Sequence, residues 1–322
     1  MNDITINVGG QAITGWSGFE VDSNLFTPAD AFSLTVERID RELIRPGLTC
    51  TLELLGRRVL TGVIDDVSVR GSRSAVSMSV TGRDRAALLV DASARPEWSW
   101  SSITLVRMLK LVADHVQLGA TVTASTAKFS SVKAELGESC WQFLERYARR
   151  AGVLIWLDPD GTLRADVPTY RGAAVATLRV GDVLDYELTE STADRYSEVN
   201  VLGQYDSSEE TYEVRGSWKD ADYPFFKPLW MTDSEVESNA MARTRARYEG
   251  ERRKWEAFKL RYSVRGVEHQ SGLWTPGNLV EVDDQRLGVK ETMLVASRKF
   301  VHGRQTGLTT QLELRRREVF FA

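Results

Sequence analysis

Three histidines, His115, His269 and His302, are the side chains of this 322-residue sequence most suited to catalysis or metal binding. None stands in an HExxH motif or at a metal-ligand spacing from another, so the pattern does not predict a catalytic zinc site. The sequence also lacks a GxSxG nucleophile motif, a Walker loop and a GxGxxG following a strand. We therefore expect no enzyme activity, no cofactor and no metal site.

Two groups of carboxylates test the alternative of a glycan hydrolase, because that chemistry needs a pair of acidic side chains. Asp65 and Asp66 are neighbours in a predicted strand, where adjacent side chains point to opposite faces, so we do not expect them to act together. Asp158-Pro159-Asp160-Gly161 has the composition of a calcium loop, but its glycine comes too early for an EF-hand and the later ligands are missing. A type I turn explains that segment.

The densest run of charge is basic and lies between residues 243 and 261. The basic cluster, as we define it, consists of Arg243, Arg245, Arg247, Arg252, Arg253 and Lys254. Such a run is usually a solvated helix face. It could equally line a subunit interface through arginine–carboxylate pairs, or a channel through which nucleic acid passes. Because the whole chain carries a net charge of −4, we favour the solvated or interface interpretation. A nucleic-acid-binding β-barrel remains an alternative, since Tyr248, Trp255 and Phe258 interleave with the cations.

The composition indicates a folded protein with two or three compact units, since 42% of the residues are hydrophobic and 27% are charged. Cys50 and Cys140 are far apart and flanked by apolar residues, so we expect two buried thiols in a protein made in a reducing cytoplasm. The first residues do not have the pattern of a signal peptide, and no apolar run reaches the length of a membrane span. We expect no membrane insertion by this chain.

Residues 1–92 are predicted to form a β-barrel. Apolar and polar residues alternate along residues 32–37, 48–54 and 76–81, which places one face of each strand on a core. Turn residues such as Pro46-Gly47 separate these runs.

Residues 93–178 are predicted to form an α/β domain. Ser101-Ser102 is expected to cap a helix that stops at Gly119. A second helix should open with a capping box of Ser139 and Gln142 and close at Gly152, and a hairpin should follow around Asp158–Gly161.

Residues 179–322 are predicted to form a second β-barrel that carries an inserted helical segment at about residues 206–258. Ser234 and Glu237 have the spacing of another capping box, for a helix that runs to about Gly250. The predicted fold is therefore mainly β with α+β insertions: two related small antiparallel β-barrels, an α/β domain and an inserted helix.

A weak internal repeat suggests that the two barrels are related. Pro46-Gly47 introduces a strand that two further strand-like runs follow, and Pro276-Gly277 does the same 230 residues later. The alternative is coincidence, because Pro-Gly before a strand is common turn chemistry.

Four segments resemble the Mu-type baseplate hub proteins of contractile-tailed phages, which are related to the N-terminal part of type VI secretion spike proteins. The first contains Gly82-Arg83 and Leu89-Val90-Asp91, and the second runs from Gly137-Glu138 through the Phe143-Leu144-Glu145-Arg146 helix to Asp160-Gly161. The third is Ser197 to Gln204, and the fourth is Gly272-Leu273-Trp274 to Val280.

The resemblance implies a structural role in the baseplate of a virion tail. The resemblance implies a ring of three subunits, each with two related barrels. Such a ring would match a hexameric tail tube on one side and a trimeric central spike on the other. The implied partners are two further copies of the chain, the tail tube protein, the central spike protein and other baseplate proteins, with DNA only passing through a channel. Synthesis and assembly would take place in the cytoplasm of the bacterial host.

Overall fold

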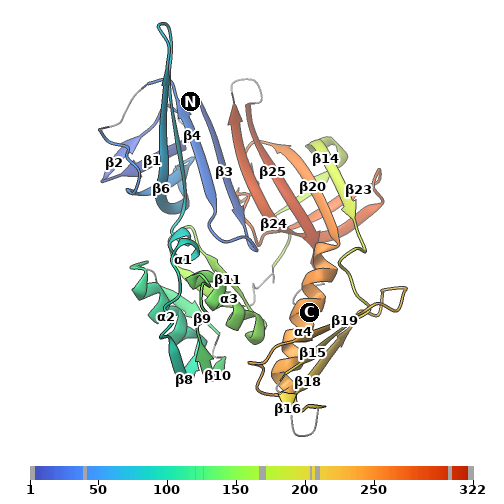
Figure 1. The fold of residues 1–322 in the computed structure, drawn as a ribbon. Coiled ribbons are helices and arrows are strands. Elements are labelled where there is room, and N and C mark those ends of the chain that lie inside the picture. The colour runs from blue at the N-terminus through green and yellow to red at the C-terminus, as the bar shows by residue number, and fades with distance from the viewer. Residues whose placement is uncertain are drawn as a thin grey trace.

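The computed structural model describes residues 4–38, 42–119, 121–125, 127–166, 172–203, 205–206, 211–303 and 307–317. A large sheet runs across the molecule, and two smaller units lie side by side beneath it (Figure 1). Strands dominate and helices are few, which confirms a mainly-β fold with helical insertions. Within the described residues, no helix combines the length and the apolar character that a membrane crossing requires.

The large sheet has 13 strands, with the order β14-β20-β25-β24-β3-β4-β7-β6-β5-β1-β2 and with β23 and β13 attached through β24. Its N-terminal strands are β1 (Ile4–Val8), β2 (Gln11–Ile13), β3 (Gly18–Asn24), β4 (Ala31–Val36), β5 (Thr49–Leu54), β6 (Arg57–Gly71) and β7 (Val76–Asp84). Its C-terminal strands are β13 (Ala176–Arg179), β14 (Val183–Glu190), β20 (Phe258–Arg265), β23 (Leu279–Asp284), β24 (Val289–Gly303) and β25 (Gly307–Arg316). A 3-10 turn, η1 (Val180–Asp182), precedes β14, and a small hairpin of β21 (Glu268–His269) and β22 (Gly272–Leu273) precedes β23.

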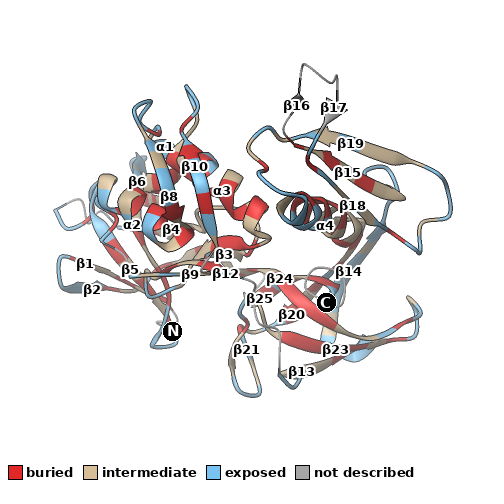
Figure 2. Cartoon of the chain, turned by 90° about the horizontal axis from the view of Figure 1, so that it is seen from below, coloured by how far each residue is buried: buried red, intermediate tan, exposed pale blue. Residues whose placement is uncertain are grey.

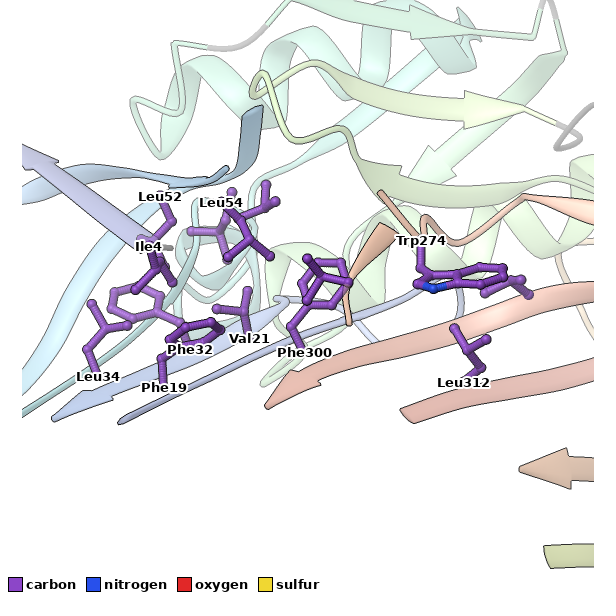
Figure 3. Packing of buried hydrophobic residues seen from close by; sticks show 14 of the residues in the cluster. Ile4, Phe19, Val21, Phe32, Leu34, Leu52, Leu54, Trp274, Phe300 and Leu312 are labelled. Carbon is purple, nitrogen blue, oxygen red and sulfur yellow. The ribbon is translucent and has the colours of Figure 1, made fainter. Parts of the chain in front are cut away.

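The two β units are joined edge to edge by the antiparallel pairing of β3 with β24, which we call the seam. In the seam Val21 lies opposite Phe300, and both are fully buried. One hydrophobic cluster continues from one unit into the other, from Leu34 and Leu52 to Leu312 and Trp274 (Figure 3). The two units therefore share a sheet and a core.

The strand order itself repeats. The first unit reads β3-β4-β7-β6-β5 and the second reads β14-β20-β25-β24-β23. Both long strands are interrupted by a bulge, at Asp65 in β6 and at Ala296 in β24. These bulges lie 231 residues apart, close to the 230 that separate the Pro-Gly turns.

The two Pro-Gly turns make the same hydrogen bonds. The Gly47 amide donates to the Ile64 carbonyl at 2.8 Å, and the Gly277 amide donates to the Val295 carbonyl at 2.8 Å. In return, the Ile64 amide donates to Leu48 at 3.0 Å and the Val295 amide to Asn278 at 2.9 Å. Each turn thus fixes the long strand directly before its bulge, so the repeat seen in the sequence is a repeat of backbone structure.

The first small unit packs helices on short sheets. Its elements are α1 (Ala87–Asp91), β8 (Ser99–Thr104), α2 (Leu105–His115), β9 (Val122–Ala124), β10 (Lys128–Lys133), α3 (Cys140–Ala151), β11 (Leu154–Leu157) and β12 (Leu163–Asp166). The capping box of Ser139 and Gln142 is present, and Gly152 ends α3 with a φ of 70°. Cys50 in β5 and Cys140 in α3 are buried free thiols, as expected.

The predicted cap of the first helix is wrong. Ser101 lies in β8, where it pairs with Ser131 of β10, so Ser101-Ser102 cannot begin a helix. Thr104 caps α2 instead, with its side chain accepting from the Arg107 amide. Strand pairing with a segment 30 residues away decides the boundary.

The second small unit is the inserted segment. Its elements are β15 (Glu198–Leu202), β16 (Tyr205–Asp206), β17 (Thr211–Tyr212), β18 (Arg215–Lys219), β19 (Pro228–Thr232) and α4 (Asn239–Glu256). Helix α4 covers the β18-β15-β19 sheet, with a small core of Val199, Val201, Val236, Ala242 and Ala246. Figure 2 shows α3 of the first small unit facing α4 of the second, with buried residues along both helices.

The predicted start and end of this helix are also wrong. Ser238, not Ser234, caps α4, since its side chain accepts from the Met241 amide. The Glu237 carboxylate is bound elsewhere, by the amides of Ser130 and Ser131 at 3.1 Å. Gly250 does not end the helix but packs under Trp218, where a Cβ would lie 2.0 Å from the indole ring.

Candidate functional site

All six residues of the basic cluster lie on α4, and the structure pairs most of them within the chain. Glu249, which is buried, accepts from Arg245 at 3.0 Å, from Arg252 at 3.0 Å and from Arg253 at 2.7 Å. Burial alone would raise the pKa of Glu249, but the charges of Arg252 and Arg245 lower it to about 2. This carboxylate is therefore the centre of a structural ion-pair network.

Two further members of the basic cluster have similar partners. Arg247 contacts Glu251 at 2.6 Å, and Lys254 contacts Asp220 at 3.0 Å and Asp222 at 2.5 Å. Arg243 is exposed. Since a paired cation has most of its charge compensated, the positive charge that α4 presents to a phosphate backbone is much smaller than six cations suggest.

A second network, which the sequence did not reveal, joins the two small units. Arg150 of α3 is nearly buried and contacts Asp233 at 2.6 Å and also Glu235, while Arg146 contacts Glu235 at 2.5 Å. The two arginines are spaced four residues apart, so they share one face of α3. That spacing is the signal that the sequence offers, but it does not identify Asp233 and Glu235 as partners, because these residues lie more than 80 positions away.

The carboxylate pairs form no catalytic site. Asp65 is held by Arg83 through Nε at 2.7 Å and Nη2 at 3.1 Å, and Arg83 also binds Asp91 at 2.7 Å. One expectation is corrected: Asp65 is the bulge residue of β6, so it lines the same shallow hollow of about 280 Å³ as Asp66. The hydrogen bond from Arg83 also lowers the pKa of Asp91, so Arg83 and its two carboxylate partners form a structural ion-pair group.

The Asp158–Gly161 segment is a turn, as predicted. The Gly161 amide donates to the Asp158 carbonyl at 2.8 Å, and β11 and β12 pair on either side of it. Asp160 accepts from the Thr162 amide at 2.8 Å, a bond that lowers the pKa of Asp160. Asp158 binds the indole of Trp156 and the guanidinium of Arg164, so both carboxylates serve the hairpin.

The three histidines lie apart from one another and contact aromatic rings. His302 stacks on Phe19, His115 meets Trp98 edge-on, and His269 meets Trp274 edge-on. Among the described residues, no group of three or more histidine, cysteine, aspartate or glutamate side chains could hold a metal ion.

A buried charged group lies next to the seam. Arg298 of β24 is almost inaccessible to solvent and donates to the Val21 carbonyl at 2.9 Å. Desolvation lowers the pKa of Arg298 to about 10 although Asp30 lies nearby, and it raises the pKa of Asp30 to about 6. Arg298 and Asp30 line a hollow of about 580 Å³ together with Asp22, Lys299 and Glu313. The guanidinium of Arg298 on β24 therefore stabilises the seam through its hydrogen bond to the Val21 carbonyl oxygen on β3.

Four domain models of phage tail proteins match consecutive segments of this chain. The N-terminal model of the Mu phage baseplate assembly protein GpP-like family matches residues 3–84, and the second-domain model of the baseplate hub protein gp44-like family matches residues 86–165. The third-domain model of the tail protein NMB1110-like family matches residues 195–248, and a C-terminal tail-protein model matches residues 253–319.

Whole-chain comparisons agree with these models. The chain is 28% identical to the baseplate hub protein gp44 of Escherichia phage Mu, over 99% of this chain and 89% of that protein. The structure is similar to that of the tail protein from Neisseria meningitidis MC58, with a TM-score of 0.87, 28% identity and coverage of 99% and 98% of the two chains. It is also similar to the 43 kDa tail protein of prophage MuSo2 from Shewanella oneidensis, with a TM-score of 0.84, 26% identity and 98% coverage of both chains.

These homologues are structural baseplate and tail proteins, not enzymes. Of the four segments that carried the sequence resemblance, all fall at least partly inside the matched domains. Gln204, which ends the third segment, lies outside the described residues.

Proposed function

We propose that this chain is a phage baseplate hub protein of the Mu type and that it forms a ring of three that joins a six-fold tail tube to a three-fold central spike. As a baseplate protein it belongs to the virion tail, where other baseplate proteins are its neighbours. We further propose that it is made and assembled in the cytoplasm of the bacterial host.

The duplicated β unit is the observation that carries this proposal. Each chain has two units with the same strand order, the same bulge and the same turn contacts. Three chains around a three-fold axis would therefore present six quasi-equivalent β units to a six-fold tube. The two small units are not duplicates of each other, and they would keep the three-fold repeat that a trimeric spike needs.

The experiment is the solution mass of the purified chain, measured by light scattering at several concentrations, with electron microscopy of the same sample. A mass of three chains and rings with six β lobes support the adaptor. A monomer or dimer up to the highest concentration would count against a ring that forms without its partners, and the same measurement with the cognate spike protein added would then decide the proposal.

The basic cluster is proposed to face a neighbouring subunit or the channel through which DNA passes. Arg243 and Arg247 are both exposed, and Arg247 is paired with Glu251, so Arg243 is the residue best placed for either contact. A nucleic-acid-binding β-barrel is the alternative function, and a DNA mobility-shift assay at low and high salt separates the two. We expect no retardation at low salt, because most of the α4 cations are paired; retardation that salt abolishes would favour the alternative.

A further inference from the structure

Two strand edges of the large sheet are uncovered, and they correspond to the two edges that meet in the seam. In the seam, β3 pairs with residues 297–302 of β24. By strand order, the counterpart of β3 in the other unit is β14, and the counterpart of β24 is β6. Within the described part of the chain, β14 pairs only with β20, and residues 66–71 of β6 pair only with β7.

The strand registers make the correspondence residue by residue. In the first unit Val21 pairs with Phe32, Phe32 with Gly82, and Gly82 with Ile64 directly before the bulge. In the second unit the matching list is Leu188, Leu260, Leu314 and Val295, again directly before the bulge.

Counting from these anchors gives the counterparts in the seam. Leu188 corresponds to Val21, and Glu187 corresponds to Glu20. Val69 lies five residues after Ile64, as Phe300 lies five residues after Val295, so Val69 corresponds to Phe300. Since Val21 lies opposite Phe300 in the seam, the corresponding pair is Leu188 opposite Val69.

The seam residues are buried and their counterparts on β14 and β6 are more exposed, as expected for strand edges that lack a neighbouring strand. Phe19 and Phe300 of the seam are 3% and 0% exposed. Tyr186, the counterpart of Phe19, is 43% exposed, and Val69 is 37% exposed. An exposed strand edge that carries large apolar side chains is a template for pairing with another chain.

We propose that β14 of one copy pairs antiparallel with residues 67–71 of β6 in a second copy, so that each contact between subunits repeats the seam within the chain. In this register Leu188 lies opposite Val69 and Glu187 lies opposite Arg70. The inference rests on the proposed ring and specifies its contact.

Three observations identify a second copy as the occupant. The two edges lie at distant positions along the strand path of one molecule, so they do not pair with each other in this structure (Figure 1). Their apolar residues match the pattern of the seam, and the glutamate and arginine carry opposite charge at facing positions. Because the two edges are different surfaces, the contact is heterologous, and its repetition closes a ring when the rotation permits.

Cysteine cross-linking tests the register directly. The double variant Leu188→Cys/Val69→Cys places two thiols on facing residues, within the reach of a disulfide. With oxidised glutathione as oxidant, we expect covalent dimers and trimers on a non-reducing gel. The matched control is Leu188→Cys/Arg70→Cys, in which the side chains point to opposite faces of the sheet and cross-linking should fall at least fivefold. The wild type, with Cys50 and Cys140 buried, should remain uncross-linked.

Charge reversal gives an independent readout. Glu187→Lys should reduce trimer association by roughly one to two orders of magnitude, because each ring contains three such pairs and like charges would face one another. Adding Arg70→Glu should restore association. A merely structural role for Glu187, through its exposed pair with Arg261 at 2.9 Å, would not be rescued by a change at Arg70.

The outcomes separate this contact from the proposed function. A stable trimer that gives no cross-link above the control and no charge rescue would overturn the β14–β6 pairing and leave the ring intact. A chain that neither trimerises nor cross-links, even with the spike protein present, would overturn both.

Discussion

The guanidinium of Arg150 forms a bidentate ion pair with the carboxylate of Asp233, with Nε at 2.9 Å from Oδ2 and Nη2 at 2.6 Å from Oδ1. The Arg150 side chain is 5% exposed and the Asp233 side chain 12%. This pair joins α3 of the first small unit to the loop before α4 of the second. The relative position of the two small units therefore depends on an ion pair that is largely removed from water. Removing one partner of such a pair is costly, because the other charge stays buried without compensation.

Replacing Arg150 should destabilise the junction between the small units. Arg150→Met removes one partner of a desolvated pair and leaves Asp233 without its main cation, so we expect a loss of about 3 kcal/mol in the free energy of unfolding. Arg149→Met is the matched control, since Arg149 pairs with Glu145 where both side chains are about one-third exposed, and it should cost less than about 1 kcal/mol. Urea denaturation measures both. Equal losses of stability in the two variants would show that the buried Arg150–Asp233 pair contributes no more than the more exposed Arg149–Glu145 pair.

Acid should weaken the α4 network through Glu249. Its pKa in the folded chain is about 2, below the ordinary 4.5, so its stabilisation is present above pH 4.5 and is lost as the pH falls towards 2. We expect Glu249→Gln to be about 3 kcal/mol less stable than the wild type at neutral pH, with the difference vanishing near pH 2. Thermal melts across this range provide the measurement. Glu97→Gln, in an exposed loop, should show almost no difference at any pH. If the loss of stability in Glu249→Gln did not change with pH, the lowered pKa of Glu249 would be refuted.

Asp30 should have the opposite pH dependence. Desolvation raises the pKa of Asp30 to about 6 from an ordinary 3.8, so its contribution to stability is complete below pH 3.8 and is lost as the pH rises through 6. Asp30→Asn resembles the protonated acid. The variant should match the wild type near pH 3.5 and be more stable by about 1–2 kcal/mol above pH 7. Denaturation at both pH values tests this; a variant that is less stable at high pH would mean that the charge of Asp30 is needed by Arg298.

Gly82 should resist substitution because of the close approach of β6 and β7. A Cβ at this position would lie 2.3 Å from the Val63 carbonyl oxygen and 2.5 Å from the Phe32 ring. Gly82→Ala must therefore push the strands apart, and we expect a cost of about 2–3 kcal/mol in the free energy of unfolding. Gly181→Ala is the control, since nothing lies within 4 Å of its Cβ position. A neutral Gly82→Ala would show that the strands separate at little cost.

The sequence by itself determined the features that depend on near neighbours. Alternating residues predicted the strands, because a side-chain period of two needs no knowledge of the partner strand. The Ser139–Gln142 capping box was confirmed, since both of its hydrogen bonds close within one turn. The Pro46-Gly47 and Pro276-Gly277 turns revealed the repeat, because each one fixes its strand through bonds over a short stretch of chain.

The tertiary structure alone decided which partners the longer-range groups have. Ser101 pairs with Ser131 and Glu237 binds the amides of residues 130 and 131, so the same residue types that suggest caps are used elsewhere. The α4 cations, which suggested a basic surface, are compensated by carboxylates that include Asp220 and Asp222 from outside the helix. The seam joins Val21 to Phe300 across 279 positions of sequence. Hydrogen bonds and ion pairs act over a few ångströms in space, and a linear pattern does not show which distant segments the fold brings within that range.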